Sequence, residues 1–351
     1  MDIPIEGRTK RMARNSVEGM MVFEFPYQLR FMKFNFIMIA VFMLLSISSF
    51  AQSSYLLYHE KVIETEHLIV NHQFEEAIAS YGEIFKSYDF IFAKDYKVAA
   101  QLAVIVKNES LALEYLMQGL KSGWPIKEIK KNKLIRPFFD SLPKAEVDAL
   151  IKNYQQSIND SLRTEAHDMF KKDQKMAIKA LFRIGQKAKN RYYEEKFAPH
   201  SEHQMAHLIE ILNKDGYLGE QLINNNYWLS TVLSHHNSIS SAYNTADTLF
   251  DYVRPKLLLA LGKGQISPFE FALIENWKIA AESNHGQASY GYLGPTLDSI
   301  SIKSANSLRN KIGLRSIELR NKLVDIQSET DIDFYLSGHP WQDGKISVNT
   351  N

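Results

Sequence analysis

The sequence has 351 residues and nearly balanced charge, with 41 Lys and Arg against 40 Asp and Glu. Hydrophobic residues make up 45% of the chain and aromatic residues 12%, which supports one or two packed cores and excludes a disordered or collagen-like protein. The absence of cysteine excludes disulfides, thiolate metal sites and cysteine nucleophiles, and the even charge balance argues against a nucleic-acid partner.

Residues 32–51 have the order of a secretory signal peptide. Lys33 precedes an apolar run over 36–45, and the small residues Ser49 and Ala51 follow it with the spacing that signal peptidase requires. We therefore expect cleavage after Ala51 and export to the periplasm or the extracellular space. Contact with a membrane is then expected only through the transient signal peptide.

The residues before this signal have a simple explanation. Met32 lies directly before the basic residue of the signal, so translation that starts there would make residues 1–31 an upstream extension. An uncleaved membrane anchor is the alternative to a signal peptide. The apolar run is shorter than the roughly 20 residues that span a bilayer, which favours the signal peptide.

Residues 52–145 show the three- and four-residue apolar spacing of helices and a weak internal repeat. Residues 74–81 align with 109–116 at a shift of 35, which places Ala77 on Ala112. A shift of this size and a small residue at a helix crossing are typical of tetratricopeptide-like helical hairpins. Solenoids normally need at least three repeats, so an irregular helical bundle is the alternative.

A second helical segment, 146–328, follows a polar stretch and shows no strand pattern, so the sequence predicts an all-α protein with an irregular helical domain after the hairpins. Ser267, Pro268 and Glu270 have the spacing of a capping box, which predicts a helix that starts at Pro268. Gly313, followed by an apolar residue, predicts that a helix ends there, with the glycine in the left-handed backbone conformation.

Two less regular segments lie in the second half of the chain. Residues 283–295 combine small residues, aromatic rings and side-chain amides, which is typical of a binding loop on a helical scaffold. Residues 329–351 are polar and irregular, and we expect a poorly ordered tail from Asp331 onward.

Several short motifs follow one another in the second domain: Asp173-Gln174, Trp228 followed by His235 and His236, residues 264–274 with Ser267-Pro268, Gln287-Ala-Ser-Tyr290-Gly291, and Arg309-Asn-Lys-Ile-Gly313-Leu314. In this order they resemble an uncharacterised family of exported bacterial helical domains. The chain departs from that family at Glu275-Asn276, where the family usually has Asp-Arg. The resemblance implies a fold and carries no reaction with it.

The motifs suggest a polar cleft that combines a general base, an amide, a phenol and an anion clamp. We expect this cleft to be formed by four side chains: His235, Gln287, Tyr290 and Arg309. The alternative is hydrogen bonding within the helical core. In that case Arg309 binds helix-end carbonyl groups or pairs with Asp298 or Glu275.

Three histidines, His200, His203 and His207, have the spacing of one helical face and form a candidate zinc site. Glu210 or His235 would complete its ligands. The sequence contains no His-Glu-x-x-His motif, so surface histidines without a metal are the expected state, and we expect no cofactor.

These features predict an exported protein-interaction or scaffold protein of the bacterial envelope, with a protein or peptide partner and no assigned reaction. The partner surface is expected to be a concave helical face with five aromatic residues: Tyr81, Tyr88, Tyr96, Tyr115 and Trp124. The alternative is a hydrolase or a small-ligand-binding domain that uses the four-residue cleft. One sequence leaves the oligomeric state open.

Overall fold

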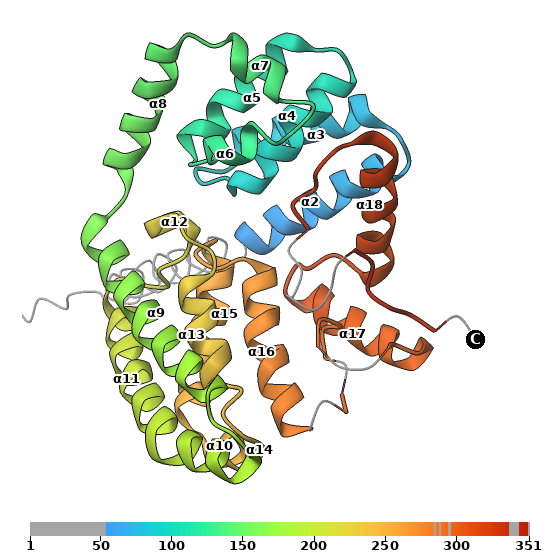
Figure 1. The fold of residues 1–351 in the computed structure, drawn as a ribbon. Helices are drawn as coiled ribbons and strands as arrows, with labels where there is room; N and C mark the ends of the chain where they lie inside the picture. The colour runs from blue at the N-terminus through green and yellow to red at the C-terminus, as the bar shows by residue number, and fades with distance from the viewer. Residues whose placement is uncertain (1–53, 284–285, 288, 294–295, 337–343, 350–351) are drawn as a thin grey trace, which may run out of the picture. The chain divides into compact units, whose positions relative to one another are not determined.

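Helices joined by short loops make up the structure, a computed structural model that describes residues 54–349 apart from 284–285, 288, 294–295 and 337–343 (Figure 1). Among these residues the β-type pairing is one parallel bridge between Leu297 and Val348. The all-α prediction is confirmed. The predicted upstream extension, 1–31, and the predicted signal peptide, 32–51, lie outside the described residues.

The first helices in chain order are α2 (Ser54–Val70), α3 (Phe74–Ser87), α4 (Ala93–Ile105), α5 (Glu109–Lys121), α6 (Ile126–Ile129), α7 (Arg136–Ser141) and α8 (Lys144–Ser157). The helices that follow are α9 (Asp160–Leu181), α10 (Gln186–Tyr192), the π-helical turn η1 (Tyr193–Phe197), α11 (Ala198–Lys214), α12 (Glu220–Ile223), α13 (Trp228–His236), α14 (Ser241–Ala246), α15 (Leu249–Gly262), α16 (Pro268–Glu282), α17 (Ser299–Lys311) and α18 (Ile317–Thr330).

Side-chain caps fix several helix starts. α16 begins at Pro268 as predicted, because the Ser267 side chain accepts from the Glu270 amide and the Glu270 carboxylate accepts from the Ser267 amide. α17 ends at Lys311, and Gly313 follows with the predicted left-handed conformation, at a φ of +69°. The amide of Leu314 donates to the carbonyl of Arg309. Both local predictions are confirmed.

A first hydrophobic core lies between α2, α3, α4 and α5, which pack as consecutive neighbours. α3 and α5 start at Phe74 and Glu109, so the 35-residue shift found in the sequence relates equivalent helix starts. Ala77 and Ala112 are both fully buried, as expected for small residues at helix crossings. The tetratricopeptide-like assignment of these hairpins stays a prediction.

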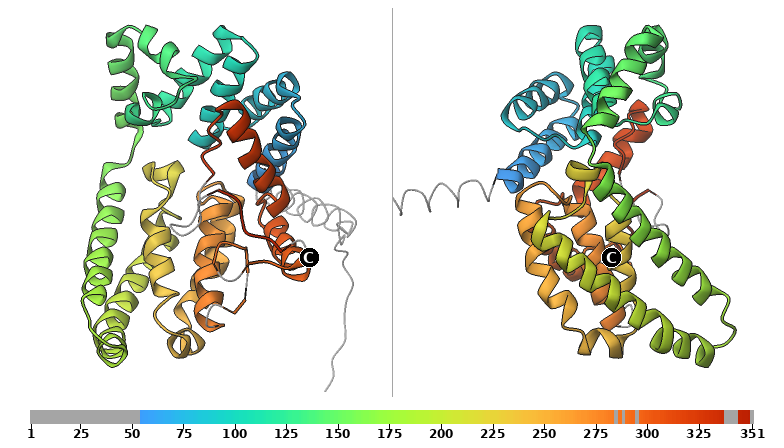
Figure 2. Two further views of the ribbon diagram at one scale, coloured as in Figure 1. Left: turned by 45° about the vertical axis from the view of Figure 1, so that its right-hand side comes forward. Right: turned by 90° about the vertical axis from the view of Figure 1, so that its left-hand side faces the viewer.

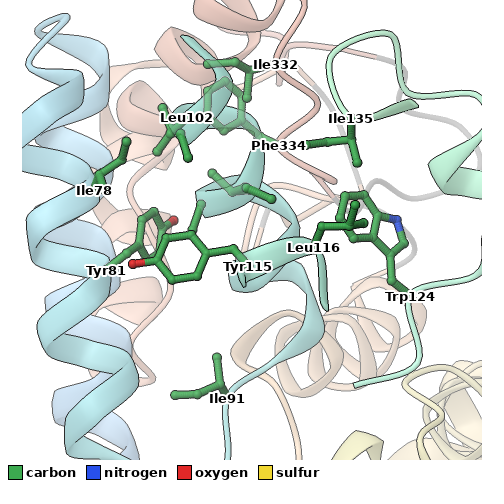
Figure 3. Packing of buried hydrophobic residues seen from close by; sticks show 14 of the residues in the cluster. Ile78, Tyr81, Ile91, Leu102, Tyr115, Leu116, Trp124, Ile135, Ile332 and Phe334 are labelled. Atoms are coloured by element: carbon green, nitrogen blue, oxygen red, sulfur yellow. The ribbon is translucent and has the colours of Figure 1, made fainter. Parts of the chain in front are cut away.

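Residues 332–336 of the C-terminal segment belong to the first core, so the prediction of a poorly ordered tail is wrong for this part. Ile332 and Phe334 are 0% and 3% exposed and lie close to Leu102 (Figure 3). The Gln101 side chain fixes the backbone of this segment, because it donates to the carbonyl of Asp333 at 2.8 Å and accepts from its amide at 2.7 Å. The sequence of this segment is mostly polar, but its alternate apolar residues Ile332 and Phe334 are buried.

The predicted domain boundary between 145 and 146 does not coincide with a boundary between the two hydrophobic cores. Val147 and Leu150 of α8 pack in the first core against α5, and Leu323 of α18 packs there as well. A second core forms between α9, α11, α13, α15 and α16, and Ile346 near the C-terminus joins it. Helices from both ends of the chain therefore build the first core, as the views in Figure 2 show for α2 and α18.

None of the helices in the described part of the chain combines the length and apolar character needed to cross a bilayer.

Candidate functional site

The structure separates the four residues of the predicted cleft. His235 lies on α13, where its Nδ1 is 2.5 Å from the Asp173 carboxylate, and it lines a small cavity of about 200 Å³ that none of the other three residues reaches. Gln287 is exposed. Tyr290 and Arg309 do meet, because Arg309 Nε donates to the carbonyl of Tyr290 at 2.8 Å. The predicted cleft is therefore not formed as one site.

Arg309 is fully buried and acts on backbone carbonyls, as the structural alternative predicted. Its Nε binds the Tyr290 carbonyl and its Nη1 donates to the carbonyl of Arg315 at 2.9 Å. The Tyr290 hydroxyl instead donates to the Glu275 carboxylate at 2.5 Å, and the Glu275 carboxylate also pairs with Arg254. Arg309 thus holds the loop between α17 and α18 in place.

The three histidines of the candidate zinc site do not share a ligand position. His200 contacts the Gln204 side chain, His207 pairs with Glu165 at 2.8 Å, and His203 is exposed. Within the ranges that the structure describes, no group of three or more His, Cys, Asp or Glu side chains has the geometry of a metal site.

The five aromatic residues expected on a concave partner surface pack in or against the first core. Tyr81, Tyr115 and Trp124 are buried, and Tyr88 and Tyr96 are half-buried against the same cluster. A continuous exposed aromatic face is therefore not present at these positions. Trp124 alone among the five lines a cavity.

A cavity of about 750 Å³ lies where the two cores meet, and we identify it as the candidate functional site. Its wall is built from α2, α4, α6, α8, α9, α12, the start of α16 and the loop between α17 and α18. This volume is in the range of small-molecule sites. The charged side chains that line it are Lys94, Asp95, Lys97, Glu128, Arg163, Glu220, Arg315 and Arg320.

Buried ion pairs join α2 and α4 to the loop before α18 at one end of the cavity. Glu66 is 3% exposed and accepts from Arg315 Nη2 at 2.6 Å, with Lys94 Nζ 4.0 Å away. Lys94 Nζ is also 2.6 Å from Asp95, which accepts from the Tyr58 hydroxyl at 2.5 Å. These contacts balance two buried carboxylates with two cations, so neither carboxylate is left unpaired.

Arg320 adds a positive charge that this network does not balance. It is 3% exposed, its Nη1 donates to the carbonyl of Gly344 at 2.5 Å, and no carboxylate of the described residues lies within ion-pair distance. Burial lowers the pKa of Arg320 and also that of Arg309 below the usual arginine value. Both side chains remain cationic, because an arginine pKa stays far above neutral pH.

The ring of Tyr292 packs against Arg309. The guanidinium carbon of Arg309 lies 4.8 Å from the centre of its ring, and the ring lines the cavity together with Arg315 and Arg320. Cations packed on an aromatic face are stabilised by the ring quadrupole. We call Arg309, Arg315 and Arg320 the arginine cluster. Within it Glu66 is the one carboxylate of the described residues that forms an ion pair.

Four polar atoms at this end of the cavity and in the adjoining arginine cluster are buried without a hydrogen-bond partner among the described residues: Arg315 Nε, Arg309 Nη2, His59 Nε2 and Glu66 Oε2. His59 is 8% exposed, and burial lowers its pKa to about 3, so its ring is neutral at neutral pH. A buried donor without an acceptor costs about 1–3 kcal/mol. An anionic ligand group beside Arg315 would supply the missing acceptor.

The acidic side chains on the other walls of the cavity offset little of the positive charge at the end where Arg315 and Arg320 lie. Glu128 is neutralised by Lys97 at 2.9 Å. Burial raises the pKa of Glu220, against the opposing hydrogen bond from the Ala93 amide, so its negative charge is disfavoured. Arg163 binds the carbonyls of Ile223 and Asn224 at the end of α12 and has a structural role there.

Apolar and aromatic side chains form part of the remaining cavity wall, beside polar residues such as Asn224, Asn225 and Asn226. Trp124 and Tyr335 line it from the first core, with Lys97 Nζ 4.6 Å from the Tyr335 ring centre, and Phe269 and Leu314 line it from the second core. The site therefore combines a cationic end with a wall that is partly apolar. This combination suits a ligand that has an anionic group on a hydrophobic framework.

Gly313 positions this end of the cavity. A side chain there would meet Cβ of His59 at 2.9 Å, and its φ of +69° disfavours other residues. The close approach of Gly313 to α2 allows Leu314 and Arg315 to reach the cavity. The sequence located this turn correctly but gave no sign of the helix that it contacts.

No protein-family model, no curated protein and no solved structure matches this chain. The resemblance to an exported helical family therefore stays a prediction. Two pairs of the motifs quoted for it lie in contact in the fold, since Asp173 contacts His235 and the Tyr290 backbone contacts Arg309.

Sequence reasoning found Arg309 and missed Arg315, Arg320 and His59. The three arginines follow one another at short spacing across one helix end, which was a usable signal. The contribution of α2 had no such signal, because His59 and Glu66 lie about 250 residues before the arginines that they approach.

Proposed function

We propose that the protein is a binding protein for a small organic anion, held in the cavity between the two cores. The observation that carries the proposal is the arginine cluster, in which the buried Arg309 and Arg320 and the 15% exposed side chain of Arg315 share one ion-paired carboxylate of the described residues. Arg315 and Arg320 line the cavity itself. Arginine is suited to this role, because its planar donors match carboxylate and phosphate groups. Trp124, Phe269 and Leu314 on part of the wall favour a ligand whose other part is aromatic or aliphatic.

This proposal develops the alternative interpretation of the sequence, with other residues in the site. The scaffold interpretation loses support because most of its aromatic residues are buried. We keep export as part of the proposal, supported by the signal-like order of residues 32–51. The protein for experiments is therefore the chain that begins at Gln52.

The proposal predicts charge-dependent binding of a simple aromatic acid. By isothermal titration calorimetry, 4-iodobenzoate should bind about tenfold or more tightly than 4-iodobenzamide, which has nearly the same shape without the charge. Arg320→Gln should weaken 4-iodobenzoate binding by about tenfold to a hundredfold, because a hydrogen bond to a charged group contributes about 1.5–3 kcal/mol. Binding of the amide should change little.

The matched control is Arg191→Gln, the same substitution at an exposed position on α10. Glutamine at position 320 keeps a donor for the Gly344 carbonyl, and urea unfolding checks that both variants are folded. Equal binding of the acid and the amide, or equal effects of the two substitutions, would count against an anion site at the arginine cluster.

A further inference from the structure

Four large apolar side chains are exposed at the tip of the hairpin formed by α9 and α10. The exposed fractions are 50% for Ile178, 78% for Leu181, 78% for Phe182 and 94% for Ile184. The first three share a helical face because they lie three and four residues apart. In the right-hand view of Figure 2 this hairpin, in green and yellow-green, projects from the neighbouring helices.

The tip is anchored from its other side. Ala180 is buried with Tyr192 and Phe197 in a small third cluster, and the Tyr192 hydroxyl donates to the Met176 carbonyl at 3.0 Å. The exposed side chains are therefore presented by a packed helix end. An apolar patch held in the open in this way commonly marks an interaction surface.

Basic residues surround this patch. Residues 171–197 contain nine lysines and arginines against three acidic residues, although the whole chain is balanced. One of the acids, Asp173, is buried against His235 and does not offset the surface charge. Cations without a carboxylate partner among the described residues include Lys175, Lys179, Arg183, Lys187 and Lys189.

We propose that the tip of the α9–α10 hairpin docks onto the surface of an anionic phospholipid bilayer. Exposed Leu, Phe and Ile side chains within a ring of Lys and Arg fit the interface of such a bilayer, where apolar groups enter below the headgroups and cations bind lipid phosphates. A protein partner of this patch would have to be both apolar and strongly acidic. The proposal departs from the expectation that only the signal peptide contacts a membrane, which rested on cleavage of that peptide after Ala51.

The test is co-sedimentation of the chain that begins at Gln52 with lipid vesicles. It should sediment with vesicles of phosphatidylcholine mixed with phosphatidylglycerol and remain in solution with phosphatidylcholine alone, and added salt should release it. The double variant Phe182→Ser and Ile184→Ser should lower the partition coefficient by about tenfold or more. Lys179→Gln with Lys187→Gln should lower it on the anionic vesicles.

The matched control replaces two exposed apolar residues elsewhere, Leu259→Ser and Ile300→Ser, which are 45% and 78% exposed. It should bind vesicles like the original chain. The proposal is overturned if the original chain does not sediment with anionic vesicles. It is also overturned if the two serine double variants bind these vesicles equally well. Sedimentation velocity adds a further contradiction: a dimer that only the Phe182 and Ile184 substitutions dissociate would assign the patch to self-association.

Discussion

Phe334→Ala is expected to lower the free energy of unfolding by about 3–5 kcal/mol, the cost of removing a fully packed phenylalanine from a core. The residue is 3% exposed and packs with α4 in the first core, although it lies in a segment that reads as a polar tail. Urea unfolding of the chain that begins at Gln52, followed by circular dichroism, measures the change.

Phe182→Ala provides the matched control, since it makes the same chemical change at a position that is 78% exposed. Its effect should stay within about 0.5 kcal/mol. Similar small losses for both variants would show that the C-terminal segment does not complete the first core. In that case the wall that Tyr335 and Arg320 give to the cavity would also be in doubt.

His59 is expected to make the folded protein sensitive to acid. Burial lowers its pKa from 6.5 to about 3 in the folded state, whereas the unfolded chain binds a proton near the ordinary value. Stability attributable to His59 is therefore complete above about pH 6.5 and is lost as the pH falls toward 3. Relative to His59→Phe, the original chain should lose about 3 kcal/mol between pH 7 and about pH 4.

The measurement is urea unfolding of both proteins at a series of pH values. Burial also raises the pKa of Glu270, to about 8, which removes stability as the pH rises from 4.5 to 8, in the opposite sense. Because both proteins contain Glu270, its contribution cancels in the difference between them. Parallel pH profiles would show that His59 is accessible to protons in the folded state and does not close the end of the cavity.

Sequence reasoning succeeded where a few neighbouring residues determine the structure. The Ser267 capping box and the Gly313 turn depend on hydrogen bonds between residues at most five apart, so their spacing alone predicts them. The all-α class followed from apolar periodicity over many residues. The equivalent starts of α3 and α5 followed from the repeat between 74–81 and 109–116.

The remaining features depend on contacts between distant parts of the chain. The pairing of Gln101 with Asp333 and that of Glu66 with Arg315 join the two ends of the sequence, and no local pattern specifies either pairing. The sequence also did not show which of the adjacent residues His235 and His236 is buried. His236, the fully buried member, contacts Ser201 and Asp247, whereas the residue chosen for the predicted cleft was His235.

The central claim is that the cavity between the cores binds an organic anion at the arginine cluster. A crystal structure of the chain that begins at Gln52 with 4-iodobenzoate tests it most directly, because anomalous scattering locates the iodine. We predict an iodine site inside the cavity, with the carboxylate within hydrogen-bond distance of Arg315 or Arg320. An iodine site only elsewhere, such as the small cavity beside His235, would contradict the claim.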